Sequence, residues 1–220
     1  MKAHEGPKVH DGQPIHRAGR SLEQAEGAMI LLHGKGAHAD NIVELSELLA
    51  CERISYIAPQ AADGMWFPRG VIDPIWRNEP HFSASLGLVD EIVSDLESHG
   101  IRRENMVFTG FCQGACLALE YVLQRPKRYG GVFALSGALL GKDERVHTHR
   151  GDLKRTPVFF GSSDIDFMVP RTRLLSSAEL FRELNADVRE RLYPGMPHTI
   201  NEEEVDLIRD ALHQLFDPDW

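Results

Sequence analysis

The sequence lacks most of the features that mark secreted, membrane-spanning or nucleic-acid-binding proteins. It has only three cysteines (Cys51, Cys112 and Cys116) and no C-x-x-C pair, so we expect no disulfide framework and a reducing, cytoplasmic location. Its 33 acidic residues outnumber its 24 basic ones, and the net charge of −9 disfavours nucleic acid and anionic membranes, because both bind clustered lysine and arginine. No apolar stretch approaches transmembrane length, and residues 1–20 lack the apolar core of a secretory signal. We therefore expect no stable membrane insertion.

Short apolar runs alternate with helical patterns along the chain. The runs predict buried strands, and the stretches with apolar residues at helical spacing predict helices between them. This alternation is typical of an α/β protein with a mostly parallel central sheet flanked by helices. Residues 1–26 are polar and predict an N-terminal polar segment or an edge hairpin, whereas residues 27–220 predict a single domain. The expected strands cover residues 28–32, 54–58, 106–109, 131–135, 157–160 and 188–193, and the expected helices cover residues 40–51, 83–98, 113–125, 171–184 and 201–216.

The segment Gly110-Phe111-Cys112-Gln113-Gly114 joins an expected strand directly to an expected helix. A residue flanked by glycine at −2 and +2 in this context has the form of a G-x-S-x-G nucleophile elbow, in which larger flanking side chains would collide. The central residue is Cys112, where the motif normally has serine. The alternative is a small buried cysteine, but the two glycines favour an exposed sulfur at a helix N-terminus, where the thiolate is stabilised.

A nucleophile of this kind requires a base and an orienting acid. His198 follows the last expected strand and precedes the last helix, so we interpret it as the base. Asp164 and Asp166 both follow the strand at 157–160, and either one is a candidate acid. The order nucleophile, acid, histidine is that of α/β-hydrolases. The backbone N–H groups of Gln113 and Lys35 are the candidates for an oxyanion hole.

The segment from residue 60 to residue 82 is long, irregular and rich in aromatic residues, which argues against disorder. Its aromatic side chains either cover the edge of the sheet or line a substrate pocket. The apolar candidates for a pocket suited to an acyl chain or an aromatic ester are Trp66, Phe67, Trp76, Leu139, Leu140 and Met168.

Five segments together resemble the phospholipase/carboxylesterase family of α/β-hydrolases, which includes acyl-protein thioesterases. The resemblance extends from about residue 28 to residue 215, and the segments are LLHGKGA (31–37), NEP (78–80), GFCQGACLALEY (110–121), GSSDIDFMVP (161–170) and YPGMPHTI (193–200). It implies a compact, lidless esterase or thioesterase that needs no cofactor and no metal. The family's serine, aspartate and histidine correspond to Cys112, Asp164 and His198.

The sequence departs from the family pattern at two points. Counting from Gly161 selects Asp164 as the acid, whereas counting back from Pro170 selects Asp166, because two extra residues lie between these anchors. We prefer Asp164, since the distance from the end of a strand determines where a side chain points. The second departure is Cys112, which resembles the cysteine nucleophile of dienelactone hydrolases.

The main hypothesis is a hydrolase of small carboxylic esters or thioesters that acts through a covalent acyl-enzyme on Cys112. Two further hypotheses stay open: a Ser-to-Cys variant of a serine carboxylesterase with weak turnover, and a non-catalytic or redox-sensing homologue that binds a small ligand, with a possible Cys112–Cys116 disulfide. A homodimer is the expected form if the chain associates. A metal site built from His33, His38, His147 and His149 is the weakest hypothesis, because the spacing matches no zinc signature.

Overall fold

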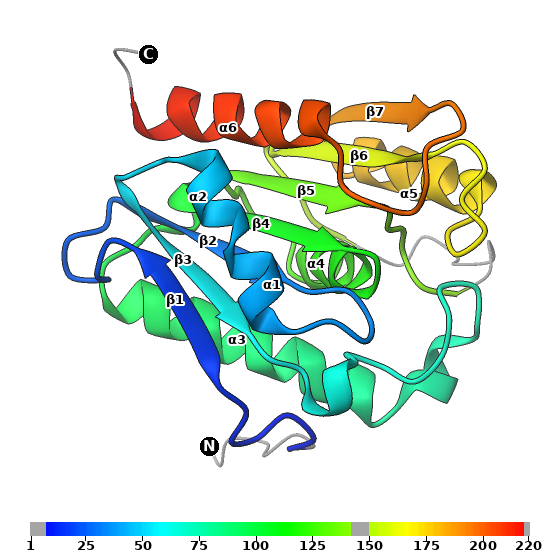
Figure 1. Cartoon of the computed structure of the whole chain (residues 1–220), viewed down its shortest axis with the longest axis horizontal. Coiled ribbons are helices and arrows are strands. Elements are labelled where there is room, and N and C mark those ends of the chain that lie inside the picture. The colour runs from blue at the N-terminus through cyan, green and yellow to red at the C-terminus, as the bar shows by residue number, and fades with distance from the viewer. Residues whose placement is uncertain (1–7, 142–149, 218–220) are drawn as a thin grey trace.

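The computed structural model describes residues 8–141 and 150–217. Seven strands form one sheet with the order β1-β3-β2-β4-β5-β6-β7, in which β1 pairs antiparallel with β3 and every other pair is parallel (Figure 1). The strands are β1 (Ile15–Gly19), β2 (Gly27–Leu32), β3 (Ile54–Pro59), β4 (Met106–Phe111), β5 (Gly131–Leu135), β6 (Pro157–Ser163) and β7 (Asp187–Tyr193). The predicted mostly parallel sheet is confirmed.

Helices cover both faces of the sheet, as Figure 1 shows. In β2, Ile30 and Leu32 pack in one apolar core, and Met29 and Leu31 pack in the other, because successive side chains of a strand point to opposite faces. The first core contains side chains of α3 (His81–Ser98), α4 (Gln113–Gln124) and α5 (Arg171–Glu183). The second contains side chains of α1 (Ala39–Val43), α2 (Leu45–Leu49) and α6 (Glu202–Phe216). A strand buried on both faces explains the continuous apolar runs of the sequence.

Three elements differ from the sequence prediction. The helix expected over residues 40–51 is divided into α1 and α2 at Glu44. The expected N-terminal edge hairpin is the single strand β1, because the chain leaves Gly19 (φ 72°) through a turn and enters β2 in the middle of the sheet. Strand β6 continues to Ser163, three residues beyond the expected end at Phe160. The last difference affects the candidate site directly.

The order of the strands produces a switch point at which a ligand-binding site can form. Strand β2 lies between β3 and β4, so the connections that follow β2 and β4 leave the sheet in different directions. Ligands of open α/β sheets bind beyond the carboxyl ends of strands at such a switch point. The segment His33–His38 follows β2, and Cys112 follows β4, so both lie at this position.

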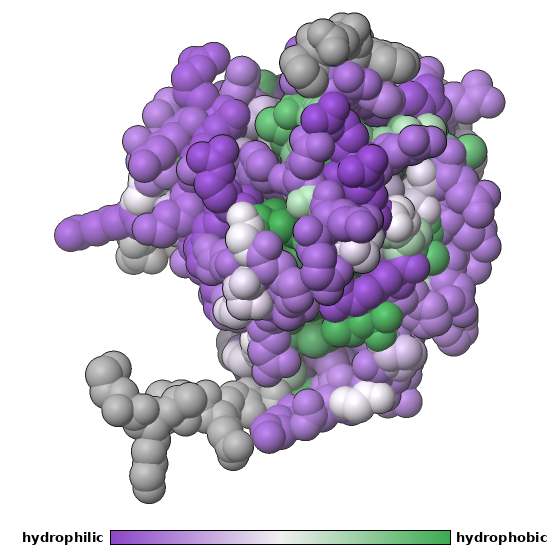
Figure 2. All heavy atoms as spheres, turned by 90° about the vertical axis from the view of Figure 1, so that its left-hand side faces the viewer, coloured by the Kyte–Doolittle hydropathy of each residue, from purple (hydrophilic) through white to green (hydrophobic). Residues whose placement is uncertain are grey.

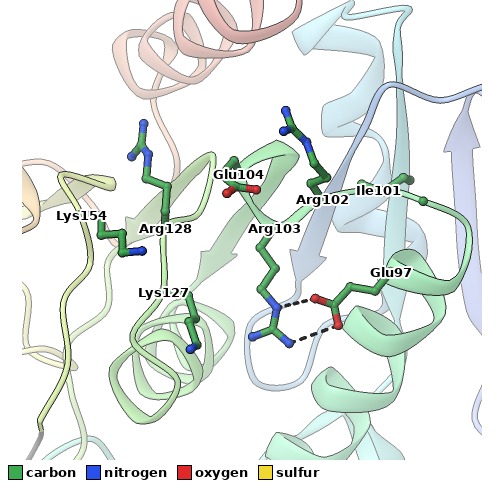
Figure 3. A pocket seen from close by; sticks show the side chains of 9 residues that line it. Glu97, Ile101, Arg102, Arg103, Glu104, Lys127, Arg128 and Lys154 are labelled. Atoms are coloured by element: carbon green, nitrogen blue, oxygen red, sulfur yellow. Dashed lines mark hydrogen bonds and ion pairs between the residues drawn. The ribbon is translucent and has the colours of Figure 1, made fainter.

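The opposite end of the sheet carries a basic hollow of about 400 Å³, shown in Figure 3. It is lined by Glu97, Gly100, Ile101, Arg102, Arg103, Glu104, Lys127, Arg128 and Lys154. Arg103 is held by an ion pair with Glu97, with 2.6 Å between Nε and Oε1. Residues 103–105 precede β4, whereas Cys112 follows it, so the hollow is separated from Cys112 by the length of the strand. None of these lining residues is a cysteine, serine, threonine or histidine.

The surface at the amino ends of the parallel strands is mainly hydrophilic. Figure 2 views the molecule from this side, and its apolar residues form small separate patches among polar ones. Within residues 8–141 and 150–217, no helix is both long and apolar enough to cross a membrane.

Candidate active site

Cys112 occupies a sharp turn between β4 and α4. Its backbone has φ 53° and ψ −115°, a strained conformation for a residue with a side chain. A Cβ atom on Gly114 would lie 1.9 Å from the Leu32 carbonyl oxygen, and one on Gly110 would lie 2.3 Å from the Gly114 carbonyl carbon. The Cys112 N–H donates to the Leu135 carbonyl of β5 at 2.9 Å. The two glycines therefore permit a turn that the sheet holds in place, as the sequence predicts.

His198 and Asp166 form a hydrogen-bonded pair beside Cys112. The distance between His198 Nδ1 and Asp166 Oδ2 is 2.8 Å, and the Asp166 side chain is fully buried. The N–H groups of Met168 and Val169 donate to Asp166 Oδ1 at 2.8 and 3.0 Å, and Ser162 Oγ donates to Oδ2 at 3.2 Å. Because the carboxylate only accepts, Nδ1 of His198 carries the proton and Nε2 is the ring nitrogen left for Cys112.

The preference for Asp164 as the partner of His198 is wrong. Asp164 is exposed, and its Oδ1 accepts a hydrogen bond from the Gly195 N–H at 2.8 Å. The prediction ended the strand at Phe160 and counted the acid from Gly161, whereas β6 continues to Ser163. Asp164 is thus the first residue beyond the strand, and the turn that follows brings Asp166 to the histidine.

The charges of this group shift the pKa values of its members. The pKa of His198 is raised to about 9: the hydrogen bond with Cys112 is the largest cause, burial opposes it, and the hydrogen bond with Asp166 adds to it. Burial raises the pKa of Asp166, but the bonds from His198 and from the Val169 and Met168 N–H groups outweigh it, so the pKa lies below its ordinary value. A protonated imidazole between a sulfur and a carboxylate is the charge state that these shifts favour.

Two aromatic rings lie near the histidine. The ring of Phe111 lies 4.8 Å from the ring of His198, measured between centroids, and the ring of Phe167 lies 6.5 Å from it. Phe167 is itself 84% exposed, so most of its ring lies in solvent, and Phe111 makes the closer contact. The contact limits the orientations available to His198.

The loop after β2 packs against the turn at Cys112. A Cβ atom on Gly34 would lie 3.0 Å from Phe111 Cδ1 and 3.5 Å from Cys112 Cβ, so the backbone approaches the turn closely. The Gly36 N–H donates to the Gly64 carbonyl at 2.7 Å, which fixes the loop at its tip. Lys35 lies between these glycines and lines the same cavity as Cys112 and Gln113.

A buried polar network supports this loop and was not predicted from the sequence. His33 Nε2 accepts from the Ala61 N–H at 3.0 Å, so Nδ1 carries the proton that is donated to the Gly34 carbonyl at 2.8 Å. Burial lowers the pKa of His33, in agreement with a neutral ring. The indole N–H of Trp66 donates to the His33 carbonyl at 2.8 Å. The glycine loop is therefore held by side chains beneath it.

The Gln113 side chain holds the next segment of the site. Its Oε1 accepts from the Trp66 N–H at 3.1 Å, and its Nε2 donates to the Phe67 carbonyl at 2.7 Å. Both bonds are buried, so the position of residues 66 and 67 depends on the residue that follows Cys112. The sequence predicted a role for the backbone of Gln113 alone.

A cavity of about 200 Å³ opens beside Cys112. It is lined by Lys35, Phe67, Arg69, Gly70, Val71, Cys112, Gln113, Cys116, Met168 and Val169. Of the predicted pocket residues, Phe67 and Met168 line it. Trp66, Leu139 and Leu140 do not line it and are fully buried in the core, and Trp76 does not line it, since it is 71% exposed with the Arg77 guanidinium over its ring. Arg69, Val71 and Val169 also line the cavity, and the sequence did not predict them as pocket residues.

A disulfide between Cys112 and Cys116 and a metal site both have little structural support. Cys112 and Cys116 are free thiols, and burial raises the pKa of Cys116 well above its ordinary range, which disfavours it as a partner in thiol exchange. Of the proposed metal ligands, His147 and His149 lie outside the described residues. Within the described ranges, no group of three or more metal-ligating side chains is present.

Comparisons with known proteins show the family of the chain. A family model described as phospholipase/carboxylesterase matches residues 18–216. A crystal structure of a phospholipase/carboxylesterase from Dyadobacter fermentans is 36% identical, has a TM-score of 0.87, and covers 91% of this chain and 96% of its own. Acyl-protein thioesterase 1 of Kluyveromyces lactis is 28% identical over 88% of this chain and 94% of its own length. The corresponding values for acyl-protein thioesterase 1 of Saccharomyces cerevisiae are 26%, 86% and 93%. The chain therefore belongs to the phospholipase/carboxylesterase family and is a hydrolase of the esterase and thioesterase type.

Proposed function

We propose that this hydrolase cleaves small carboxylic esters or thioesters with Cys112 as nucleophile, His198 as general base and acid, and Asp166 as the orienting carboxylate. The observation that carries the proposal is the pair of His198 and the buried Asp166, 2.8 Å apart, beside a cysteine at a glycine-flanked turn. A base held by a third group next to the nucleophile is the general arrangement for covalent acyl transfer.

The first half of the reaction acylates the sulfur. The Cys112 thiolate, paired with the His198 imidazolium, attacks the carbonyl carbon and forms a C–S bond, and the carbonyl electrons move to the oxygen. Collapse of this intermediate expels the alcohol or thiol, which takes the proton of His198. The product is an enzyme thioester on Cys112.

The second half hydrolyses this thioester. Acylation removes the hydrogen bond of the sulfur, which is the largest cause of the raised pKa of His198, and it removes the charge of the sulfur as well. The pKa of the histidine falls as a result, and neutral His198 accepts a proton from the attacking water. The carboxylic acid leaves, and Cys112 regains its thiolate as the imidazole becomes protonated.

Two backbone N–H groups are suited to donate hydrogen bonds to the negatively charged oxygen of the intermediate. Gln113 is the first residue of α4, and the first N–H groups of a helix have no partner within the helix. Lys35 follows Gly34, which packs against Cys112. Removal of one such donor in a hydrolase typically lowers kcat by about 10²–10³-fold, so this hole carries a large share of the rate.

The test is intact-mass spectrometry after incubation with 4-nitrophenyl acetate. We expect one acetyl group on the chain and none on Cys112→Ala, and release of 4-nitrophenolate in a burst followed by slower turnover. Cys112→Ser serves as the matched control, because it keeps the position and changes only the attacking atom. Equal acetylation and hydrolysis by Cys112→Ala contradicts the proposal.

The sequence-based predictions of a cytoplasmic location and of a homodimer stay predictions. Sedimentation velocity of the purified chain tests the second. A single species at the mass of one chain across micromolar concentrations contradicts the homodimer.

A further inference from the structure

The cavity beside Cys112 contains basic side chains and no acidic ones. Lys35 and Arg69 are among its ten lining residues, and none of the ten is aspartate or glutamate. The whole chain has a net charge of −9, so a cavity with two cations differs in sign from the molecule around it. Clefts lined by charge of one sign attract ligands of the opposite sign.

The remaining wall of the cavity is mainly apolar. Phe67, Val71 and Val169 are buried at its lining, and Met168 is partly exposed at 44%. A cavity of about 200 Å³ with this wall suits a short hydrocarbon segment. Apolar wall and cationic residues together fit a molecule that has a short carbon chain and an anionic group.

The backbone of Arg69 is held in place by a hydrogen bond, and its side chain is available to bind a ligand. The Arg69 N–H donates to Oδ1 of the buried Asn78 at 2.8 Å, which anchors the residue to the segment before α3. The side chain is exposed, and the part of the chain that the structure describes gives the guanidinium no hydrogen-bond or ion-pair partner. A guanidinium group in this situation can bind a carboxylate through two parallel hydrogen bonds.

Asp73, the acidic residue near Arg69 in the sequence, bonds to other groups. Oδ2 of Asp73 accepts from the Gly70 N–H at 3.1 Å, and its Oδ1 lies 3.8 Å from Arg77 Nη1. Lys35 donates from Nζ to the Pro68 carbonyl at 3.0 Å, a bond that holds the ammonium group and leaves its charge uncompensated. Among the described residues, Asp73 therefore forms no ion pair with either Lys35 or Arg69.

We propose that the substrate of this hydrolase is an ester or thioester that carries a carboxylate, and that Arg69 binds this carboxylate with the charge of Lys35 in support. This inference rests on the proposed function, because the carboxylate that Arg69 binds belongs to the substrate whose acyl group is transferred to Cys112. It assigns Arg69 as a specificity-determining residue and leaves the bond-breaking step to the groups already described.

The test compares two esters of equal chain length, mono-4-nitrophenyl adipate and 4-nitrophenyl hexanoate, each corrected for hydrolysis without enzyme. We expect a higher kcat/KM for the adipate ester. In Arg69→Gln, KM for the adipate ester rises about tenfold or more while kcat changes little, and the hexanoate values stay the same, since a hydrogen bond to a charged group is lost only for the anion. A third ester, 4-carboxyphenyl hexanoate, carries the anion on the leaving group and shows which side of the scissile bond Arg69 contacts.

Two variants separate recognition from a general effect of charge. Arg69→Lys keeps the charge but loses the planar fork, and we expect it to restore part of the preference. Arg102→Gln removes the same charge from the basic hollow at the far end of the sheet (Figure 3), and we expect it to leave the preference unchanged. An equal rise of KM for the adipate ester in Arg102→Gln and Arg69→Gln overturns the proposal. Such a result indicates that the preference comes from the long-range electrostatic field of the protein and not from a bond to Arg69.

The same measurements distinguish failure of the carboxylate site from failure of the proposed function. Cys112-dependent hydrolysis of the hexanoate ester with no preference for either anionic ester overturns the carboxylate site and leaves the nucleophile intact. Absence of hydrolysis of all three esters, together with absence of acylation at Cys112, overturns the proposed function itself.

Discussion

Asp166 accepts a hydrogen bond from His198 at 2.8 Å, and its other oxygen is held by two backbone N–H groups, so its carboxylate has one fixed orientation. Asp164, two residues earlier, binds the Gly195 N–H instead. Two neighbouring aspartates thus have separate tasks: one orients the imidazole, and the other holds the turn that precedes it.

Replacement of the two aspartates should therefore have different consequences. Asp166→Asn removes the charge that stabilises the imidazolium, and because the asparagine NH₂ group can donate to Nδ1, it favours the wrong tautomer. We expect kcat for 4-nitrophenyl acetate to fall by about 10²–10⁴-fold. Stopped-flow and steady-state assays measure the change.

Asp164→Asn is the matched control. It keeps an oxygen for the Gly195 N–H, so we expect kcat within about threefold of the original and a loss of stability of about 1 kcal/mol or less. A large loss of kcat in Asp164→Asn with normal activity in Asp166→Asn would restore the acid first preferred from the sequence.

The protonation of His198 should depend on the sulfur beside it. The pKa of His198 is raised to about 9 chiefly by Cys112, so the imidazole is protonated at neutral pH and loses its proton as the pH rises through about 9. In Cys112→Ala this cause is absent, and we expect the pKa to move down toward the ordinary value of about 6.5. NMR titration of the imidazole resonances in both proteins gives the two values. The same pKa in both would show that the sulfur and the imidazole do not interact.

The turn at Cys112 should tolerate no side chain at position 114. In Gly114→Ala the new Cβ would meet the Leu32 carbonyl oxygen at 1.9 Å, a contact with backbone that cannot be relieved by rotation of a side chain. We expect a loss of about 3 kcal/mol or more in the free energy of unfolding, measured in urea.

Gly87→Ala provides the comparison within the same protein. Gly87 lies inside α3, and a Cβ there would meet nothing within 4 Å. Alanine in this position should stabilise the chain by about 0.5–1 kcal/mol, because it reduces the freedom of the unfolded state. Equal stability of Gly114→Ala and Gly87→Ala would contradict the close approach described for the turn.

Glu204 should make the stability depend on pH. Burial raises the pKa of this carboxyl to about 7 from its ordinary value of 4.5, and its Oε1 is buried without a partner in the part of the chain that the structure covers. The group favours the folded state fully below about pH 4.5, and this contribution is lost as the pH rises through about 7, at a cost of at most about 3 kcal/mol.

Glu204→Gln should remove this dependence. We expect the free energy of unfolding of the variant to change less than that of the original between about pH 5 and pH 8, and Glu202→Gln, at an exposed position of the same helix turn, to behave like the original. Urea titrations at both pH values decide the matter. Parallel changes in the original and in Glu204→Gln would show that the carboxyl is already ionised at the lower pH.

The elements that the sequence predicts well are those determined by local patterns. The apolar run at residues 28–32 predicts a strand buried on both faces, and the glycines at 110 and 114 predict the turn, because only glycine fits there. The choice between Asp164 and Asp166 has no such local pattern. It depends on where β6 ends, and the polar residues Ser162 and Ser163 give no apolar signal that the strand continues.

The pocket was predicted poorly for a related reason. Trp66 and Leu139 are apolar like the residues of a pocket, but tertiary packing buries them completely, whereas the polar Arg69 lies at the cavity. Composition alone cannot separate a core residue from a pocket residue. The two hydrogen bonds of the Gln113 side chain also have no signature in the sequence, since they join segments that are 46 and 47 residues apart.

The hydrogen bond from the Cys112 N–H to the Leu135 carbonyl has a consequence for how this enzyme can diverge. Cys112, the proposed nucleophile, is held through its backbone by two adjacent central strands, β4 and β5, while much of the cavity wall, including Phe67, Arg69 and Val71, comes from the connection after β3. Insertions and substitutions in that connection can alter the range of acyl groups without moving Cys112, whereas the connection after β6 also carries Asp166 and is constrained by it. New specificity is thus available to this chain by changes in the loop after β3, with the proposed nucleophile, base and acid left in place.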